Sequence, residues 1–256
     1  MSIYSLFEQN PFFILGHRGY SEKYPENTMA SFEACAKDKR INGIELDVHL
    51  CKSGEVVIAH DGNLKRTAGI DKYIEDMTWD ELQNIDVGSF KDKAFANERM
   101  PLLRDVFEKF GSRFVYDIEL KVETGRKYKK LCNLVWELIT SNGLEENVMV
   151  SSFNPKALGY FNKVCMMSVP TADIYDDIPS LPGFLRHGWG HHISRSSFSK
   201  PGCNLFKGDY KPEKGREMIT WTVNSAQEAR FLLKIDGIKG FIGNNPVLLA
   251  DILEEK

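Results

Sequence analysis

The stretch Ile44-Glu45-Leu46-Asp47-Val48-His49-Leu50 alternates apolar and polar side chains at every position. Such alternation is typical of a β-strand, in which successive side chains point to opposite faces of the sheet. Glu45, Asp47 and His49 therefore share one face, while the apolar side chains share the other and can pack against helices. Carboxylates that point into a barrel interior repel one another and lose hydration, so they require a cation or hydrogen-bond donors beside them. The stretch predicts a strand with a charged interior face.

Apolar runs of strand length recur along the rest of the chain, separated by segments with helical spacing. This order predicts a parallel sheet with helices on its outside. The predicted strands are Phe13 to His17, Gly43 to Leu50, Arg113 to Lys121, Asn147 to Ser152, Val164 to Ser168, His192 to Arg195, Met218 to Val223 and Gly240 to Gly243. This number of strands favours an α/β fold of the TIM-like (β/α)8 barrel type, in which catalytic groups lie at the C-terminal ends of the strands.

Helical spacing of apolar residues marks a further set of segments. They are Thr28 to Lys39, Tyr128 to Ser141, Pro155 to Asn162, Ser225 to Lys234 and Pro246 to Glu254. For the first of these helices, Asn27 after Pro25 is the predicted N-cap. For the helix that begins near Ser225, that serine and Glu228 form a predicted capping box.

The segment 61–101 does not follow the alternation of strands and helices. It is polar, rich in turn residues and longer than a simple connection between barrel elements. We interpret it as a small inserted subdomain after the second strand region, forming a lobe over the barrel mouth within a single domain of residues 1–256. The segment 183–212 is a second irregular region.

The composition narrows the range of partners and locations. The 33 basic and 36 acidic residues nearly cancel, which argues against nucleic acid as a partner because domains that bind it are usually strongly basic. The five cysteines lack any CxxC spacing and are expected to be reduced thiols. No basic segment opens the chain, and the apolar run 12–15 is too short for a signal sequence or a membrane-spanning helix. We expect a cytoplasmic protein without stable membrane insertion, and the oligomeric state stays open.

A second predicted strand also carries charged residues at alternate positions. In Tyr116-Asp117-Ile118-Glu119-Leu120-Lys121, the side chains of Asp117, Glu119 and Lys121 share one face. This adds inward carboxylates to the pair on the first stretch, and hard oxygen donors of this kind suit Mg²⁺ or Ca²⁺. A buried cluster of ion pairs with Arg18 and Lys121 explains the same spacing equally well.

Two histidines occupy positions at which a barrel places its chemistry. His17 ends the first predicted strand, and His60 follows the short apolar run 56–59. Imidazoles titrate near neutral pH and can act as base and acid in turn, each contributing about 10²- to 10⁴-fold to a rate. A single histidine is more often structural, so the indication of proton transfer comes from the pair.

Two sets of short motifs run through the chain in a fixed order. The N-terminal set is His17-Arg18-Gly19, Pro25-Glu26-Asn27-Thr28, Gly43 to Val48 and Val57 to Asp61. The later set is Met100-Pro101-Leu102, Ile118 to Lys121, Val150 to Phe153 and Trp221-Thr222-Val223-Asn224. Together they resemble the glycerophosphodiester phosphodiesterase family over nearly the whole chain. The N-terminal set is specific as a combination, because each motif occurs in the family's order and at a similar spacing.

This resemblance implies a TIM-like barrel with a subdomain inserted after His60. It also implies metal-dependent hydrolysis of a small-molecule glycerophosphodiester to sn-glycerol 3-phosphate and an alcohol. The implied site consists of Glu45, Asp47 and Glu119 as ligands of one divalent cation, Mg²⁺ or Ca²⁺, His17 and His60 as the general acid/base pair, Arg18 and Lys121 as phosphate contacts, and Phe153 and Trp221 as pocket walls. Whether water or the substrate's own 2-hydroxyl attacks the phosphorus stays open.

Alternative functions and one departure from the family pattern accompany this interpretation. The same site could serve a lysophospholipase D-like activity if a groove admits an acyl chain, or the barrel could bind phosphodiesters without catalysis.

Where the family often has a Thr-Asp pair, this chain has Gly243-Asn244, so we expect different hydrogen bonding at the pocket floor. The late histidines His187, His191 and His192 are interpreted as solvated or packed side chains.

Overall fold

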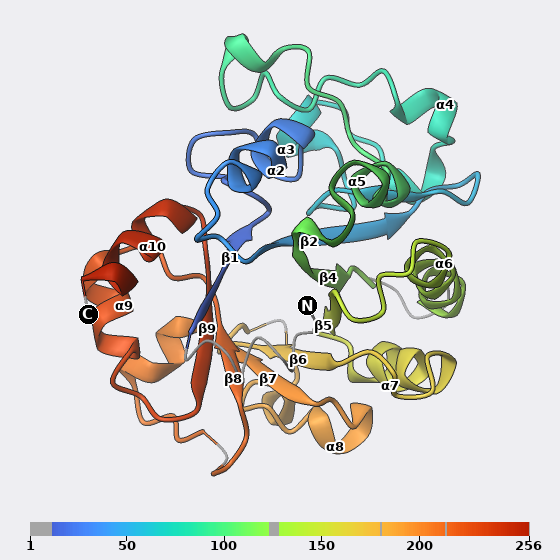
Figure 1. Cartoon of the computed structure of the whole chain (residues 1–256). Helices are drawn as coiled ribbons and strands as arrows, with labels where there is room; N and C mark the ends of the chain where they lie inside the picture. Colours follow the sequence, from blue (N-terminus) through green and yellow to red (C-terminus); the bar gives the residue numbers. More distant parts are fainter. Residues whose placement is uncertain (1–11, 123–127, 180, 213, 256) are drawn as a thin grey trace.

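The structure is a computed structural model that describes residues 12–122, 128–179, 181–212 and 214–255 (Figure 1). Its centre is a barrel of parallel strands. They are β1 (Phe13–His17), β2 (Gly43–Leu50), β4 (Val115–Leu120), β5 (Val148–Ser152), β6 (Thr171–Tyr175), β7 (Phe198–Pro201), β8 (Met218–Thr220) and β9 (Ile238–Gly243). Each strand pairs in parallel with its neighbour, and β1 pairs with both β2 and β9. The sheet is therefore closed, and the prediction of a TIM-like barrel is confirmed.

Helices surround the barrel (Figure 1). They are α2 (Met29–Ala36), α5 (Leu103–Phe110), α6 (Tyr128–Ser141), α7 (Pro155–Val164), α8 (His191–Ser194), α9 (Ala226–Leu232) and α10 (Pro246–Glu254), with the 3-10 turns η3 (Gly111–Arg113), η4 (Gly183–Leu185) and η5 (Cys203–Lys207). The outward side chains of β2 and β4 pack with those of α2, α5, α6 and α7 in the largest apolar cluster. Among the described helices, none is both long and apolar enough to cross a membrane.

The register between β2 and β4 positions the charged residues. Glu45 pairs with Asp117, and Asp47 pairs with Glu119, so polar side chains on adjacent strands lie at matching heights. All residues of both strands are buried. The alternation predicted from the sequence therefore directs one set of side chains outward to the helices and the other set into the barrel.

Two predicted strands are wrong. The run from Val164 to Ser168 is the end of α7 and the turn that follows it, where Met166 and Met167 have positive φ angles of 50° and 60°. Likewise, 192–195 lies largely within α8. The true strands, β6 and β7, were missed because their sequences contain a buried aspartate and a buried lysine that break the expected apolar pattern.

The helix caps differ from the prediction in two places. Thr28, not Asn27, is the N-cap of α2, and its side chain accepts a hydrogen bond from the backbone N–H of Ser31. Ser225 does cap α9 by accepting from the backbone N–H of Glu228 at 3.2 Å. The Glu228 carboxylate, however, accepts from the backbone N–H of Asn224 and not from that of Ser225.

A small insert follows the second barrel strand. The chain first forms β3 (Val56–Ile58), which pairs antiparallel to β2. It then passes through the short elements α3 (Lys65–Ala68), η1 (Ile74–Asp76), α4 (Trp79–Leu82) and η2 (Lys93–Phe95) before reaching α5. Ile74, Leu82 and Met100 belong to an apolar cluster that packs on Val57 and is separate from the main barrel clusters. The insert lies beside the N-terminal strands in Figure 1.

Candidate active site

The predicted site residues gather at the C-terminal ends of the barrel strands. A cavity of about 260 Å³ lies there. Its lining consists of His17, Arg18, Glu45, His60, Glu119, Lys121, Phe153, Ile174, Ile178, Lys200, Trp221 and Ile242. Asp47, the remaining residue predicted from the sequence, lies against Glu45 and Glu119. The structure therefore brings the whole predicted set together.

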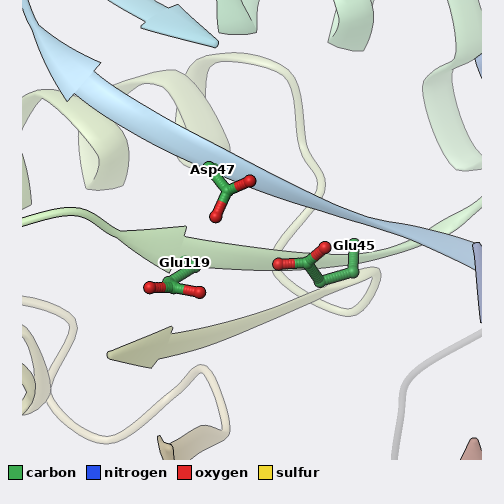
Figure 2. Close-up of side chains that lie close together, drawn as sticks. All are labelled: Glu45, Asp47 and Glu119. Carbon is green, nitrogen blue, oxygen red and sulfur yellow. The ribbon is translucent and has the colours of Figure 1, made fainter. Parts of the chain in front are cut away.

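Three carboxylates converge at one edge of this cavity (Figure 2). Glu45 and Asp47 extend from β2 and Glu119 from the neighbouring β4, and one oxygen from each lies within 4.8 Å of the others. Their residues are only 2%, 1% and 7% exposed. Within the described ranges, this is the one place where three or more potential metal ligands meet.

Cations and donors on the protein compensate only part of this negative charge. Lys121 Nζ lies 2.9 Å from Asp47 Oδ1 and 2.7 Å from Glu119 Oε1. Arg18 Nε lies 3.5 Å from Asp47 Oδ2, and the Arg18 backbone N–H donates to Glu45 Oε2 at 3.0 Å. Asp47 Oδ1 is fully buried, yet no described donor makes a well-directed hydrogen bond to it. An oxygen of this kind fits a metal ligand.

The pKa values of Glu45 and Asp47 shift in opposite directions. Burial, followed by the charge of Asp47, raises the pKa of Glu45 well above its ordinary value. Burial acts in the same direction on Asp47, but the nearby charges of Lys121 and Arg18 outweigh it and lower the pKa of Asp47. Three ionised carboxylates exceed these two cations by one charge. A divalent cation bound between them would turn this excess of one negative charge into an excess of one positive charge and would favour the ionised form of Glu45, so the donor set fits Mg²⁺ or Ca²⁺.

The backbone turn after β1 places His17 and Arg18 at the site. Arg18 and Gly19 both have positive φ angles, 54° and 80°. A Cβ at Gly19 would clash with the Ser31 hydroxyl, so this turn requires glycine. His17 Nε2 lies 3.9 Å from Glu45 Oε2. Burial and the charge of Arg18 lower the pKa of His17 to about 3, so its imidazole is neutral at physiological pH.

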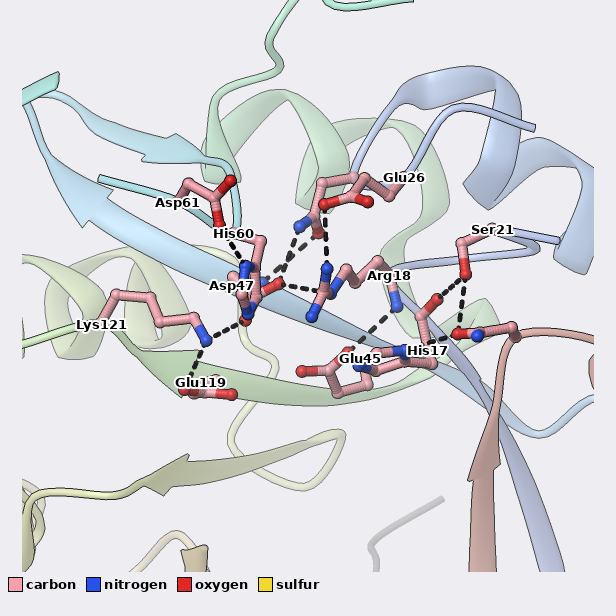
Figure 3. Close-up of polar contacts among 12 residues, drawn as sticks. His17, Arg18, Ser21, Glu26, Glu45, Asp47, His60, Asp61, Glu119 and Lys121 are labelled. Carbon is pink, nitrogen blue, oxygen red and sulfur yellow. Dashed lines mark hydrogen bonds and ion pairs between the residues drawn. The ribbon is translucent and has the colours of Figure 1, made fainter. Parts of the chain in front are cut away.

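His60 is held by a chain of ion pairs that starts in the insert, and Figure 3 shows its two ends, the contact of His60 with Asp61 and that of Arg18 with Glu26. His60 Nδ1 lies 2.6 Å from Asp61 Oδ1. Arg66 on α3 donates to Asp61 and to Glu26, both at 2.6 Å, and Glu26 accepts from Arg18 at 2.9 Å. Arg66 of the insert therefore fixes the Asp61 carboxylate beside His60. Through Glu26, it also fixes the Arg18 guanidinium beside the three carboxylates.

Apolar side chains form the opposite side of the cavity. The rings of Phe153 and Trp221 meet edge to face, with centroids 5.6 Å apart and an interplanar angle of 84°. Trp221 Nε1 donates to the backbone oxygen of Lys200 at 2.9 Å, which fixes the orientation of the indole. Ile174 and Ile178 complete this side. A substrate with one anionic and one less polar part fits such a divided pocket.

Three polar residues of the site were not predicted as such from the sequence. Asn27 donates through Nδ2 to Asp47 Oδ2 at 2.8 Å, although the sequence suggested only a helix cap. Asn244 contacts His17, and Lys200 enters the barrel from β7. Asn27 lies inside the motif Pro25-Glu26-Asn27-Thr28 and could have been found from it. Lys200 was not predicted because the strand that carries it, β7, was not recognised from the sequence.

The other histidines lie apart from this constellation. His49, on the same face of β2 as the carboxylates, has its Nε2 3.2 Å from the backbone oxygen of His60. The rings of His191 and His192 contact each other at a tilt of 43°, with centroids 3.9 Å apart, and His187 lines a different cavity of about 600 Å³. None of the late three joins a convergent metal-ligand group within the described part of the chain.

Comparisons with known proteins agree with this geometry. The Glycerophosphoryl diester phosphodiesterase family matches residues 17–182. A glycerophosphodiester phosphodiesterase of Bacillus altitudinis is 31% identical over 94% of this chain and 98% of its own length. Lysophospholipase D GDPD1 of Homo sapiens is 28% identical over 93% of this chain and 85% of its own.

Solved structures show the same fold as this chain. The phosphodiesterase of Oleispira antarctica, solved in complex with the product sn-glycerol-3-phosphate, superposes with a TM-score of 0.82 at 23% identity. The match covers 97% of this chain and 99% of that one. The family match and the full-length relatives lead to one conclusion: this chain belongs to the glycerophosphoryl diester phosphodiesterase family, a family of phosphoric diester hydrolases.

Proposed function

We propose that this protein hydrolyses glycerophosphodiesters to sn-glycerol 3-phosphate and an alcohol, using one divalent cation, Mg²⁺ or Ca²⁺, held by Glu45, Asp47 and Glu119. The observation that carries the proposal is the convergence of these buried carboxylates, within 4.8 Å of one another, with two histidines at one cavity. A binding-only site has no need of paired proton-transfer groups. The relatives' names support the same reaction.

The charge requirements of phosphodiester cleavage match the residues of the cavity. The transition state gathers negative charge on the non-bridging oxygens, and a cation bound by the three carboxylates would stabilise it there. Arg18 and Lys121 are positioned to contact the same phosphate group, since both line the cavity beside the carboxylates. Phe153 and Trp221 would exclude water and pack against the carbon skeleton of the substrate.

The environments of the two histidines suggest different proton roles. Asn244 Oδ1 lies 2.6 Å from Nδ1 of His17, so Nε2 is the nitrogen left to accept the proton of the attacking hydroxyl. His60 contacts the Asp61 carboxylate, which orients the imidazole for delivery of a proton to the departing alcohol oxygen. Either water or the glycerol 2-hydroxyl is compatible with this arrangement of base and acid.

An activity assay tests the proposal. Protein stripped with EDTA is supplied with Mg²⁺ or Ca²⁺ and either glycerophosphocholine or glycerophosphoethanolamine, and released glycerol 3-phosphate is measured. We expect release only with a divalent cation, and loss of at least about 10²-fold in Glu45→Gln. Glu137→Gln, an exposed carboxylate on α6, is the matched control and should be unaffected. No release from either diester with any divalent cation would refute the proposed reaction.

A lysophospholipase D-like activity is the second candidate. The Homo sapiens relative bears that name, and one side of the cavity is apolar. Comparing glycerophosphocholine with lysophosphatidylcholine, which differ by one acyl chain, decides between the two. Faster turnover of the acylated substrate would favour the second candidate.

We also propose that residues 1–256 form one domain, of which 61–101 is an integral lobe, because Arg66 of this segment takes part in the ion pairs behind the site. A cytoplasmic location is supported by the cysteines, all five of which are buried and unbridged.

A further inference from the structure

A buried lysine inside the barrel has no part in the proposed reaction. Lys200 extends from β7 into the interior and is 2% exposed. Its Nζ lies 2.7 Å from Asp117 Oδ2 and 3.0 Å from Ser151 Oγ, and the Ser151 hydroxyl donates to Asp117 Oδ1 at 2.7 Å. Of the three N–H donors of the ammonium group, one is directed at Ser151, while Asp117 Oδ2 lies in ion-pair contact without a well-directed hydrogen bond. The group can therefore also attract a further anionic partner.

That partner is a proposed cation ligand. Lys200 Nζ lies 4.0 Å from Glu45 Oε1, while the other oxygen, Oε2, accepts the backbone N–H of Arg18 at 3.0 Å. The carboxylate therefore lies between a fixed backbone donor and an ammonium group that Asp117 and Ser151 hold in place. A glutamate side chain has three rotatable bonds, so the backbone hydrogen bond and the attraction of the nearby ammonium together limit its conformations.

The side chains of the other two cations at the site pair with carboxylates other than Glu45. Lys121 pairs with Asp47 and Glu119, and the Arg18 side chain pairs with Asp47 and Glu26. Among the ion pairs of the described residues, Lys200 is the one lysine or arginine within 4.0 Å of the Glu45 carboxylate. Without this ammonium, the charge of Asp47 would drive Glu45 away from the cluster.

We propose that Lys200 is a positioning residue that holds Glu45 toward Asp47 and Glu119, so that the three carboxylates are preorganised for a divalent cation. The inference rests on the proposed function, because it takes Glu45 as a cation ligand. The buried pair of Asp117 and Lys200 therefore does more than fill the barrel interior, because Asp117 holds the Lys200 ammonium group near Glu45. Outer groups that orient metal ligands typically change metal affinity by about 10- to 100-fold when removed.

The test removes the pair without changing the net charge. Lys200→Met with Asp117→Asn deletes one positive and one negative charge and keeps similar volumes, and such neutral replacements of buried pairs usually leave proteins folded. Isothermal titration calorimetry of metal-stripped protein with Mn²⁺ measures the affinity directly, independently of turnover. We expect the dissociation constant to rise about 10- to 100-fold in the double variant.

The control is a double variant of an ion pair on the surface. Lys207 and Glu228 pair at 2.8 Å between η5 and α9, and Lys207→Met with Glu228→Gln removes the same charges far from β2. This control should bind Mn²⁺ as the wild type does. If Lys200→Met/Asp117→Asn does not fold, as judged by circular dichroism, Lys200→Gln with Asp117→Asn also removes both charges and keeps a side-chain donor for Ser151. The same loss of affinity is expected for it.

The outcomes separate this inference from the proposed function. If the folded double variant binds Mn²⁺ within about threefold of the wild type, Lys200 serves Asp117 alone and the inference is wrong. If the wild type itself binds no divalent cation, the metal-dependent function fails as well. Weakened binding in the Lys200 variants alone, with the surface control unchanged, supports the positioning role.

Discussion

Asn244 Oδ1 lies 2.6 Å from Nδ1 of His17, at the seam where β9 pairs with β1 and closes the barrel. An amide oxygen only accepts hydrogen bonds, so Nδ1 must carry the proton and Nε2 is left free to accept one. Asn244 stands at the position where the family pattern often has the aspartate of a Thr-Asp pair. Gly243 is explained as well, because a Cβ there would clash with the backbone oxygen of Val223.

Replacing Asn244 should therefore affect catalysis through the tautomer of His17. We expect Asn244→Ala to lower kcat by about 10²-fold with little change in KM, because the substrate contacts remain while the base loses its orientation. Asn244→Asp restores an acceptor and should recover most of the rate. Steady-state kinetics on glycerophosphocholine checks both. An alanine variant with wild-type kcat would show that His17 needs no such partner.

His60 is predicted to protonate the leaving alcohol, which makes its importance depend on the substrate. With glycerophosphocholine, His60→Ala should lose about 10²- to 10⁴-fold in kcat. With a glycerol 4-nitrophenyl phosphodiester, whose phenolate departs without protonation, the same variant should retain most of its rate. His17→Ala should be impaired on both substrates. Equal losses for His60→Ala on the two diesters would contradict its role as the acid.

The neutral state of His17 has a consequence for stability at acidic pH. Burial and Arg18 lower its pKa from 6.5 to about 3, so between these values the unfolded chain takes up a proton that the folded protein does not. The stability that depends on neutral His17 is thus complete above pH 6.5 and is lost as the pH falls. The loss amounts to at most about 1.4 kcal/mol per pH unit.

Urea denaturation in EDTA at pH 7, 6, 5 and 4 measures this effect. The His17→Gln variant has no imidazole to protonate, so it should lose less free energy of unfolding than the wild type over that range. Other ionisable groups are common to both proteins and cancel in the difference. Parallel pH profiles for the two would mean that His17 titrates normally in the folded protein.

Sequence reasoning found most of the fold because the barrel has regular patterns. Strict alternation in β2 and β4 determines which side chains face inward, and the register of Asp47 against Glu119 then follows from parallel pairing. Strands β6 and β7 were missed for a physical reason. Lys200 pairs with Asp117 on β4, and Asp173 accepts a hydrogen bond from Ser194 on α8, and such distant partners of buried polar residues cannot be seen from periodicity.

The candidate site was predictable to a similar extent. His17, His60 and the three carboxylates lie in motifs whose combination is specific, and each is found at the cavity. The residues that orient them come from distant segments. Asn244 is 227 positions from His17 in the chain, so only the closed barrel reveals their contact. Arg66 also acts across a long separation, reaching Glu26 from the insert.

The claim that Glu45, Asp47 and Glu119 hold the catalytic cation is tested most directly by anomalous X-ray diffraction from crystals grown with Mn²⁺. We predict one strong peak between the three side chains, with an oxygen of each about 2.0 to 2.6 Å from it. A peak elsewhere in the barrel, or none at this cluster despite Mn²⁺-dependent turnover, would contradict the account.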